Sequence, residues 1–402
     1  MPAPTSTSQF GSATIQGVAP LPAFNLTRQY QSIRNEVREA IDRVLTTQHF
    51  IGGSEVESFE TEVAKYLGVA ACIACASGTD ALWLGLQALE IRPGDSVLTT
   101  PFSFFASASS ITRRGATPVF ADIDPATLNL RPDSVEAAIK RDGKGKIKAV
   151  VPVHLFGQCA DMDTLLGLSN EAGVPLLEDA AQAFGAKWGA KMAGSWGTAA
   201  AFSFYPTKNL GAYGDGGCVT TDNPEMAAHL RRLRNHGSRE RYYHEDIGWN
   251  SRLDALQAAL LRVKLPHLDD WNGQRRYLAQ RYDSLLHQAG LTEAGKLTPN
   301  DAAPIAPIRA RAEAFHIFHQ YVVRGLRRDD LRSSLAQQGI GTEIYYPLPL
   351  HLQQAFANLG YGRGDFPEAE RAAAEVLALP MFPELREDEQ QRVVAAIADF
   401  YS

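Results

Sequence analysis

Short apolar runs alternate with helix-like segments over residues 68–235, and this alternation constrains the fold more than any other feature of the chain. The runs include ACIACAS, SVLTTP, TPVFADI, KAVVPVHLFG and VPLLEDA. Strands separated by helices pair in parallel, and the helices cover both faces of the sheet. We therefore predict an α/β fold with a mostly parallel central sheet and helices on both faces.

The pattern changes after about residue 252, where a long helical stretch interrupted only by Pro266 is followed by short mixed segments. We predict a large domain over residues 21–252 and a smaller C-terminal α+β domain over residues 253–402. Residues 1–20 are rich in Ser, Thr, Pro, Ala and Gly and lack the basic and apolar regions of a signal peptide. We expect them to form a flexible tail of a cytoplasmic protein.

Composition argues against two classes of partner. Hydrophobic residues make up 45% and charged residues 21% of the chain, and no run approaches the roughly 18 apolar residues of a membrane helix. The net charge of −6 disfavours nucleic-acid binding, which needs a basic surface. Cys72 and Cys75 are three residues apart in an expected strand, so they point to opposite faces. We expect inert core thiols and no metal site.

The loops that directly follow strands are the expected ligand site, because ligands of parallel sheets bind beyond the carboxyl ends of the strands. One such loop contains Lys208, between the apolar run AAAFSFY and the glycine-rich turn GAYGDGG. A lysine held there can form a Schiff base with an aldehyde cofactor, provided that its surroundings favour the neutral amine. The alternative for Lys208 taken alone is a solvated surface charge.

A second loop carries Asp179 and Gln182, at the end of VPLLEDAAQ. A buried carboxylate needs a positive partner, and the protonated pyridine nitrogen of pyridoxal 5'-phosphate (PLP) is one. Gln182 would then donate to the phenolic oxygen on the other side of the ring. A helix cap is the alternative interpretation of Asp179.

A phosphate site is predicted at SGTDA, where Gly78 and Thr79 open a helix after a strand. Free N–H groups and the helix dipole bind phosphate at such a point, and Ser203 would add its hydroxyl. An ordinary turn is the alternative. In PFSFF, Phe104 is our candidate for the ring that stacks on the pyridine face.

These positions agree on one cofactor, PLP. The sequence also resembles the DegT-type nucleotide-sugar aminotransferases, which have the aspartate aminotransferase fold (fold type I). The resemblance spans nearly the whole chain, and its motifs include SGTDAL, PVFADID, EDAAQAFGA, FSFYPTKNLGAYGDGG, GWNSRLDALQAALLRVKL and YYPLPLHLQ. It implies the same roles for Lys208 and Asp179. It also implies PLP contacts for Gly78, Thr79, Gln182 and Ser203.

Further roles rest on the resemblance alone. Asn250 would reach the PLP phosphate of the neighbouring subunit in a homodimer with shared active sites, and Arg252 would approach the substrate from that neighbour. Tyr345, Tyr346 and His351 would line the sugar pocket, although Tyr345 stands where many relatives carry His. Buried polar side chains satisfied by the backbone are the alternative for these residues. The arginines of residues 231–241 are assigned to no ligand.

The expected reaction is a ping-pong transamination in which glutamate donates the amino group, 2-oxoglutarate leaves and a nucleotide-linked keto-sugar accepts the nitrogen. We favour a 3-keto sugar, with a 2-acetamido group as one option, and a product used for cell-surface polysaccharide, lipopolysaccharide or glycoside synthesis. A 4-keto-sugar aminotransferase and a non-catalytic regulator are the alternatives. The related dehydratases carry His where this chain has Lys208, and no G-x-G-x-x-G or P-loop motif supports a dinucleotide or nucleoside triphosphate.

Overall fold

The computed structural model describes residues 19–143 and 145–402, so the predicted tail lies outside the described residues except for positions 19 and 20. The helices are α1 (Leu26–Thr47), α2 (Ser54–Leu67), α3 (Gly78–Ala88), α4 (Ala106–Arg113), α5 (Pro132–Asp142), α6 (Met162–Ala172), α7 (Pro224–Leu233), α8 (Ala255–Lys264), α9 (Leu268–Gln288), α10 (Arg328–Gln337), α11 (Pro367–Glu375) and α12 (Glu387–Tyr401). Short 3-10 helices are η1 (Leu155–Gly157), η2 (Leu265–His267), η3 (Leu350–Leu352) and η4 (Gln354–Leu359).

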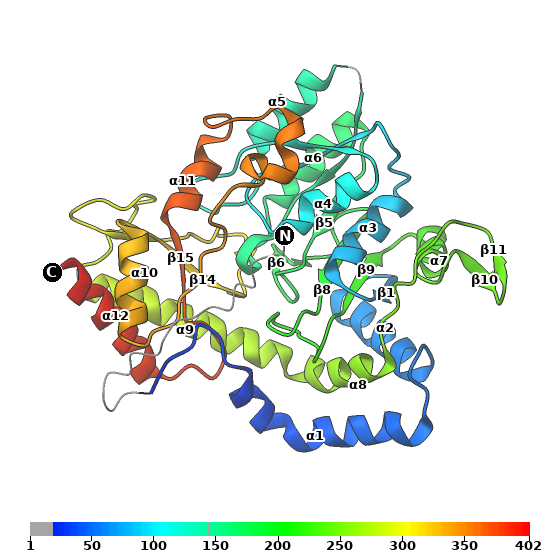
Figure 1. The fold of residues 1–402 in the computed structure, drawn as a ribbon, viewed down its shortest axis with the longest axis horizontal. Coiled ribbons are helices and arrows are strands. Elements are labelled where there is room, and N and C mark those ends of the chain that lie inside the picture. Colours follow the sequence, from blue (N-terminus) through cyan, green and yellow to red (C-terminus); the bar gives the residue numbers. More distant parts are fainter. Residues whose placement is uncertain (1–18, 144) are drawn as a thin grey trace, which may run out of the picture.

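The strands are β1 (Ala71–Cys75), β2 (Ser96–Thr99), β3 (Thr117–Phe120), β4 (Ile147–Val151), β5 (Leu177–Asp179), β6 (Lys187–Trp188), β7 (Lys191–Met192), β8 (Ala199–Ser203), β9 (Gly217–Thr221), β10 (Ser238–Glu240), β11 (Tyr243–His244), β12 (Ile305–Pro307), β13 (Ala314–Phe315), β14 (Tyr321–Gly325) and β15 (Val376–Leu379). Figure 1 shows two parts of the molecule, the central sheet with its helices and the C-terminal part, and α9 extends from the end of α8 into the C-terminal part.

The central sheet has the order β1-β9-β8-β5-β4-β2-β3, because parallel bridges beside β4 and β5 join a four-stranded and a three-stranded sheet. All neighbours pair in parallel except β9, which is antiparallel to both β1 and β8. The predicted mostly parallel sheet is therefore confirmed. The alternation over residues 68–235 did not predict the reversal at β9, which follows β8 through a loop without a crossover helix.

Helices cover both faces of this sheet, as the buried side chains of β1 illustrate. Cys72 packs into a cluster with residues of α1, α2, α5, α6 and α8, whereas Cys75 packs on the other face with residues of α3, α4 and α7. Both are free buried thiols, as predicted. Figure 1 shows α1 and α8 lying side by side along one edge of the molecule.

The C-terminal part is built on the antiparallel sheet β12-β14-β15, which packs with α9, α10 and α12 around a separate apolar cluster. Helix α8 packs into the cluster of the central sheet, and Leu278 in α9 is already in the C-terminal cluster. Leu21 also joins the C-terminal cluster. A division into folding units at residue 253 thus stays a prediction. No helix in the described residues combines the length and apolarity that crossing a membrane requires.

Candidate active site

A cavity of about 680 Å³ opens where the loops after β1, β2, β5 and β8 meet residues 319–320 and 344–346 of the C-terminal part. The sheet places these loops together because the carboxyl ends of parallel strands lie at one edge. The predicted site residues that line it are Gly78, Thr79, Phe104, Asp179, Gln182, Ser203, Lys208, Tyr345 and Tyr346. Nine residues from five separate segments of the chain are thus brought to one place.

Lys208 lies in a turn in which its own backbone N–H donates to the carbonyl of Tyr205 at 2.8 Å. Its side chain is half-buried because one side faces the cavity. Burial lowers the pKa of the Lys208 amine to about 8, and the negative charge of Asp179 opposes this shift. The amine therefore gains and loses its proton close to neutral pH, as a group that forms imines and transfers protons must.

Asp179 ends β5 and is 4% exposed. Burial raises the pKa of its carboxyl, while a hydrogen bond from the Ser107 hydroxyl at 2.7 Å, the N–H of Ala181 and the charge of Lys208 hold it down. A carboxylate buried this deeply is stable as an anion only beside a positive group. A protonated pyridine nitrogen fits that requirement.

The neighbouring Glu178 points away from the cavity, because successive strand residues face opposite sides of the sheet. It is fully buried. Its carboxylate accepts hydrogen bonds from three backbone N–H groups of the 194–197 loop at 2.7–2.8 Å and lies 2.9 Å from Nε2 of His154. Of the two adjacent carboxylates, only Asp179 is thus available to a cofactor.

The start of α3 forms a cradle against β8. Ser77 caps the helix by accepting from the N–H of Asp80 at 3.1 Å, and the N–H groups of the first turn, at Gly78 and Thr79, have no partner within the helix. A Cβ on Gly78 would lie 2.5 Å from Cβ of Ser203, so only glycine permits this approach. The cradle suits a phosphate, since free N–H groups, a positive helix end and a hydroxyl meet there.

The amide of Gln182 has a fixed orientation. Its Oε1 accepts from the backbone N–H of Phe156 at 2.7 Å, and its Nε2 donates to the Tyr346 hydroxyl at 3.0 Å. The amide N–H₂ therefore faces the cavity, as a donor to a ring oxygen must. Phe104 is 57% exposed, and its ring lies 6.3 Å from that of Tyr346. Together they form an aromatic wall.

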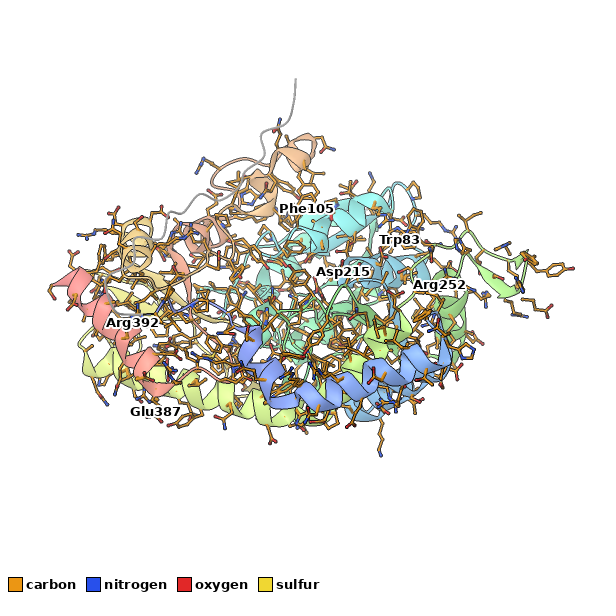
Figure 2. The ribbon with its side chains drawn as sticks, turned by 60° about the horizontal axis from the view of Figure 1, so that its bottom comes forward. Trp83, Phe105, Asp215, Arg252, Glu387 and Arg392 are labelled. Carbon is orange, nitrogen blue, oxygen red and sulfur yellow. The ribbon has the colours of Figure 1, made fainter. Side chains whose placement is uncertain are left out.

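Three predicted residues do not reach this cavity within one chain. Asn250 and Arg252 line a second depression of about 450 Å³, and Asp215 lines both cavities. Figure 2 shows Asp215 near the middle of the molecule and Arg252 nearer the projecting β10–β11 hairpin. His351 is 1% exposed in η3, where Nε2 lies 3.2 Å from the Glu370 carboxylate, so it packs in the C-terminal part and does not line the cavity.

Several residues at the site had no assignment from the sequence. The Ser107 hydroxyl in α4 donates to Asp179 and lies 2.8 Å from the hydroxyl of Ser103, in the loop before that helix. His319 lines the cavity although 110 positions separate it from its partner Asn209. No local pattern predicts such a contact.

The fold and the cavity together define a fold type I, PLP-dependent transferase, because a mostly parallel sheet presents a lysine, a carboxylate and a helix N-terminus at one edge. The model of the DegT/DnrJ/EryC1/StrS aminotransferase family matches residues 31–398, and the chain belongs to that family. It is a PLP-dependent aminotransferase, and the predicted cofactor and fold are confirmed.

Relatives span almost its whole length. The chain is 49% identical over 381 residues to a pleiotropic regulatory protein of Geobacillus stearothermophilus, covering 95% of this chain and 98% of the relative. It is 42% identical over 377 residues to the UDP-N-acetyl-3-dehydro-alpha-D-glucosamine 3-aminotransferase of Acidithiobacillus ferrooxidans, covering 94% and 97%. It also matches the crystal structure of S. venezuelae DesV in complex with a ketimine intermediate, with a TM-score of 0.89, 41% identity and coverage of 96% and 99%.

Proposed function

We propose that this chain transfers an amino group from glutamate to a nucleotide-linked keto-sugar, with Lys208 as the residue that binds PLP covalently. The observation that carries the proposal is that Lys208, Asp179 and the start of α3 at Gly78 line one cavity. PLP, when bound, supplies an electron sink that allows an amino acid to lose its α-proton. The roles of the protein residues follow from their surroundings.

Lys208 takes up and returns the proton at Nζ, since the pKa of about 8 leaves a useful fraction of neutral amine near pH 7. Asp179 holds a proton on the ring nitrogen, and Ser107 holds the Asp179 carboxylate in its charged form through the 2.7 Å hydrogen bond. The N–H groups at Gly78 and the Ser203 hydroxyl bind the phosphate. The aromatic wall of Phe104 and Tyr346 excludes water from one side of the cavity.

The favoured acceptor is a sugar with a keto group at C3, linked to a nucleoside diphosphate. The relative of A. ferrooxidans is named as a 3-aminotransferase of a UDP-linked 3-dehydro amino sugar, and its similarity covers nearly the whole chain. A 4-keto sugar is the second candidate for the same site. The regulatory name of the G. stearothermophilus relative favours the other alternative, a regulator, whereas a lysine with a lowered pKa facing the cavity favours chemistry.

A homodimer with shared sites is part of the proposal. Among the described residues that line the cavity, Lys208 is the one lysine and there is no arginine. Glutamate and a nucleoside diphosphate carry several negative charges, which arginine side chains bind well. Arg252 and Asn250 line a separate depression beside Asp215, from which a second copy would receive them.

Reduction of the PLP-loaded protein with borohydride tests the covalent role. We expect one tagged lysine, Lys208, and loss of both the tag and the glutamate-dependent change in the visible spectrum in Lys208→Met. Lys264 is the matched control, because it is a buried lysine whose pKa is also lowered to about 8 but which does not line the cavity. A tag on Lys264 or turnover by Lys208→Ala contradicts the proposal.

Complementation tests the shared site. A heterodimer of a Lys208→Ala chain and an Asn250→Ala chain contains one intact site if Asn250 acts in trans. Mixing the two weakly active variants should therefore restore activity. If subunits exchange and no activity returns, Asn250 serves the site of its own chain.

The position of amination is tested in the reverse direction, which avoids preparing an unstable 3-keto sugar. The enzyme is incubated with 2-oxoglutarate and UDP- or dTDP-linked 3-amino or 4-amino sugars, and glutamate is measured. We expect faster turnover of the 3-amino compounds. Faster turnover of the 4-amino compounds would replace the C3 assignment by C4, and turnover of neither would favour the regulator.

A further inference from the structure

Lys208 lies in a short loop that closes on itself, here called the lysine loop (residues 204–212). The N–H of its last residue donates to the carbonyl of its first residue at 2.8 Å. A Cβ on Gly211 would lie 2.3 Å from the carbonyl oxygen of Pro206, so only glycine allows the two sides of the loop to approach this closely. The place of Lys208 in the cavity therefore depends on the loop staying closed.

A buried lysine of α8 holds the returning end of the lysine loop. Lys264 is 0% exposed, and its Nζ donates to the carbonyl of Gly211 at 2.6 Å. No other described residue donates a hydrogen bond to this carbonyl. The same Nζ lies 4.1 Å from the ring centroid of Tyr213, the first residue after the loop. Lys264 thus contacts the chain on both sides of the point where the loop ends.

Packing alone does not account for a lysine at this position. A lysine is rarely buried without a negative partner, yet no acidic side chain of the described residues forms an ion pair with Lys264, and burial alone lowers its pKa to about 8. An apolar side chain of the same length would fill the space without the cost of burying an amine. The hydrogen bond to Gly211, which the amine donates whether charged or neutral, is the contact that requires a lysine.

We propose that Lys264 is a positioning residue for Lys208, because its hydrogen bond to the carbonyl of Gly211 keeps the lysine loop closed and the Lys208 amine in the place where PLP binds. The inference rests on the proposed covalent role of Lys208. Without the donor, the buried carbonyl of Gly211 must reach water or stay unpaired. The loop then opens at this end, and Lys208 loses its fixed position relative to Asp179.

Three substitutions separate the hydrogen bond from the packing of α8. Lys264→Met keeps the length of the side chain and removes the donor, whereas Lys264→Arg keeps a donor. Leu260→Ala is the matched control, because Leu260 is a buried residue of the same helix that packs in a cluster without any residue of the lysine loop.

The first measurement is hydrogen exchange of the full-length, cofactor-free protein, read by mass spectrometry in peptides that cover the lysine loop. The N–H groups of Lys208 and Ala212 donate within the loop, so they exchange when it opens. We expect exchange to be about 10-fold faster in Lys264→Met, the effect of one unpaired buried acceptor. In Lys264→Arg and Leu260→Ala it should stay within about threefold of the wild-type rate.

The second measurement is the affinity of the same proteins for PLP, which separates positioning from a role in stability alone. A stabilising residue changes the unfolding free energy and leaves the Kd of the folded protein unchanged. The proposed role predicts a Kd about 10-fold higher in Lys264→Met and within about threefold of wild type in Lys264→Arg and Leu260→Ala. Unchanged exchange or an unchanged Kd in Lys264→Met, or equal effects in Lys264→Met and Leu260→Ala, overturns the inference.

Urea unfolding confirms that each variant is folded under the conditions of measurement. If Lys264→Met does not fold, Lys264→Gln replaces it, because this shorter polar side chain stops short of Gly211. Faster exchange of the lysine loop in that variant supports the inference, and wild-type exchange refutes it. Borohydride reduction at saturating PLP separates the inference from the proposed function. A tag on Lys208 in the Lys264 variant leaves that function intact whatever the exchange rates are, whereas a tag on another lysine contradicts it.

Discussion

Replacing Gly78 by alanine tests the cofactor cradle. The new Cβ would lie 2.5 Å from Cβ and 3.1 Å from Cα of Ser203, whereas carbon atoms in contact are about 3.5–4.0 Å apart. The start of α3 must therefore move by about 1 Å, and overpacking of this kind costs about 1–3 kcal/mol of unfolding free energy. A shift of about 1 Å also stretches a hydrogen bond of about 2.9 Å beyond its useful range. Loss of one charge-assisted hydrogen bond weakens PLP binding by about 10- to 100-fold.

Urea unfolding of the cofactor-free protein and titration with PLP measure the two effects. Gly167→Ala is the matched control, because Gly167 lies inside α6 with no atom near its Cβ position, so alanine should stabilise the helix by about 0.5–1 kcal/mol and leave PLP affinity unchanged. Adding Ser203→Gly to Gly78→Ala removes the clashing Cβ and should recover part of the stability without recovering affinity. If Gly78→Ala changes neither quantity, the cradle is not where we place it.

Two other predictions concern charges. Ser107→Ala removes the hydrogen bond that lowers the pKa of Asp179, so the loss of PLP affinity on acidification should begin about one pH unit higher, while Ser110→Ala on the same helix should not move it. An unshifted profile would exclude this role of Ser107. Lys264 is buried, donates to the carbonyl of Gly211 at 2.6 Å and has its pKa lowered from 10.5 to about 8. Between these two pKa values the unfolded chain binds more protons than the folded chain. The unfolding free energy of the wild-type chain, measured with urea, should therefore rise relative to that of Lys264→Met by about 2 kcal/mol from pH 8 to 9.5. The same pH dependence in both chains would contradict this.

The sequence predicted site residues where a residue type that carries chemistry lies at or just after the end of a predicted strand. Asp179 ends a strand, and Gly78 and Lys208 follow strands by three and five residues, so the strand pattern alone places them at one edge of the sheet. The mostly parallel sheet followed from the same pattern. Strand β9 was the exception, because the five buried residues of a short strand, GCVTT, carry no sign of its direction.

Contacts between distant segments could not be predicted in this way. The hydrogen bond from Ser107 to Asp179 joins positions 72 residues apart, and the contact of His319 with Asn209 joins positions 110 apart. Such pairs depend on how α4 and the C-terminal part pack on the sheet, which no local period encodes. The resemblance grouped His351 with Tyr345 and Tyr346, but η3 turns the imidazole toward Glu370 and away from the cavity.

The adjacent carboxylates of β5 restrict how this gene can change. Glu178 anchors the 194–197 loop and Asp179 faces the cavity, so insertion or deletion of a single residue before them would exchange their sides. Shortening Glu178 to Asp withdraws the carboxylate by one methylene from three backbone amides, and lengthening Asp179 to Glu pushes a methylene toward the cofactor. Selection for folding therefore acts on the codon of Glu178 and selection for catalysis on the adjacent codon of Asp179, and a shift of register at this point would damage both.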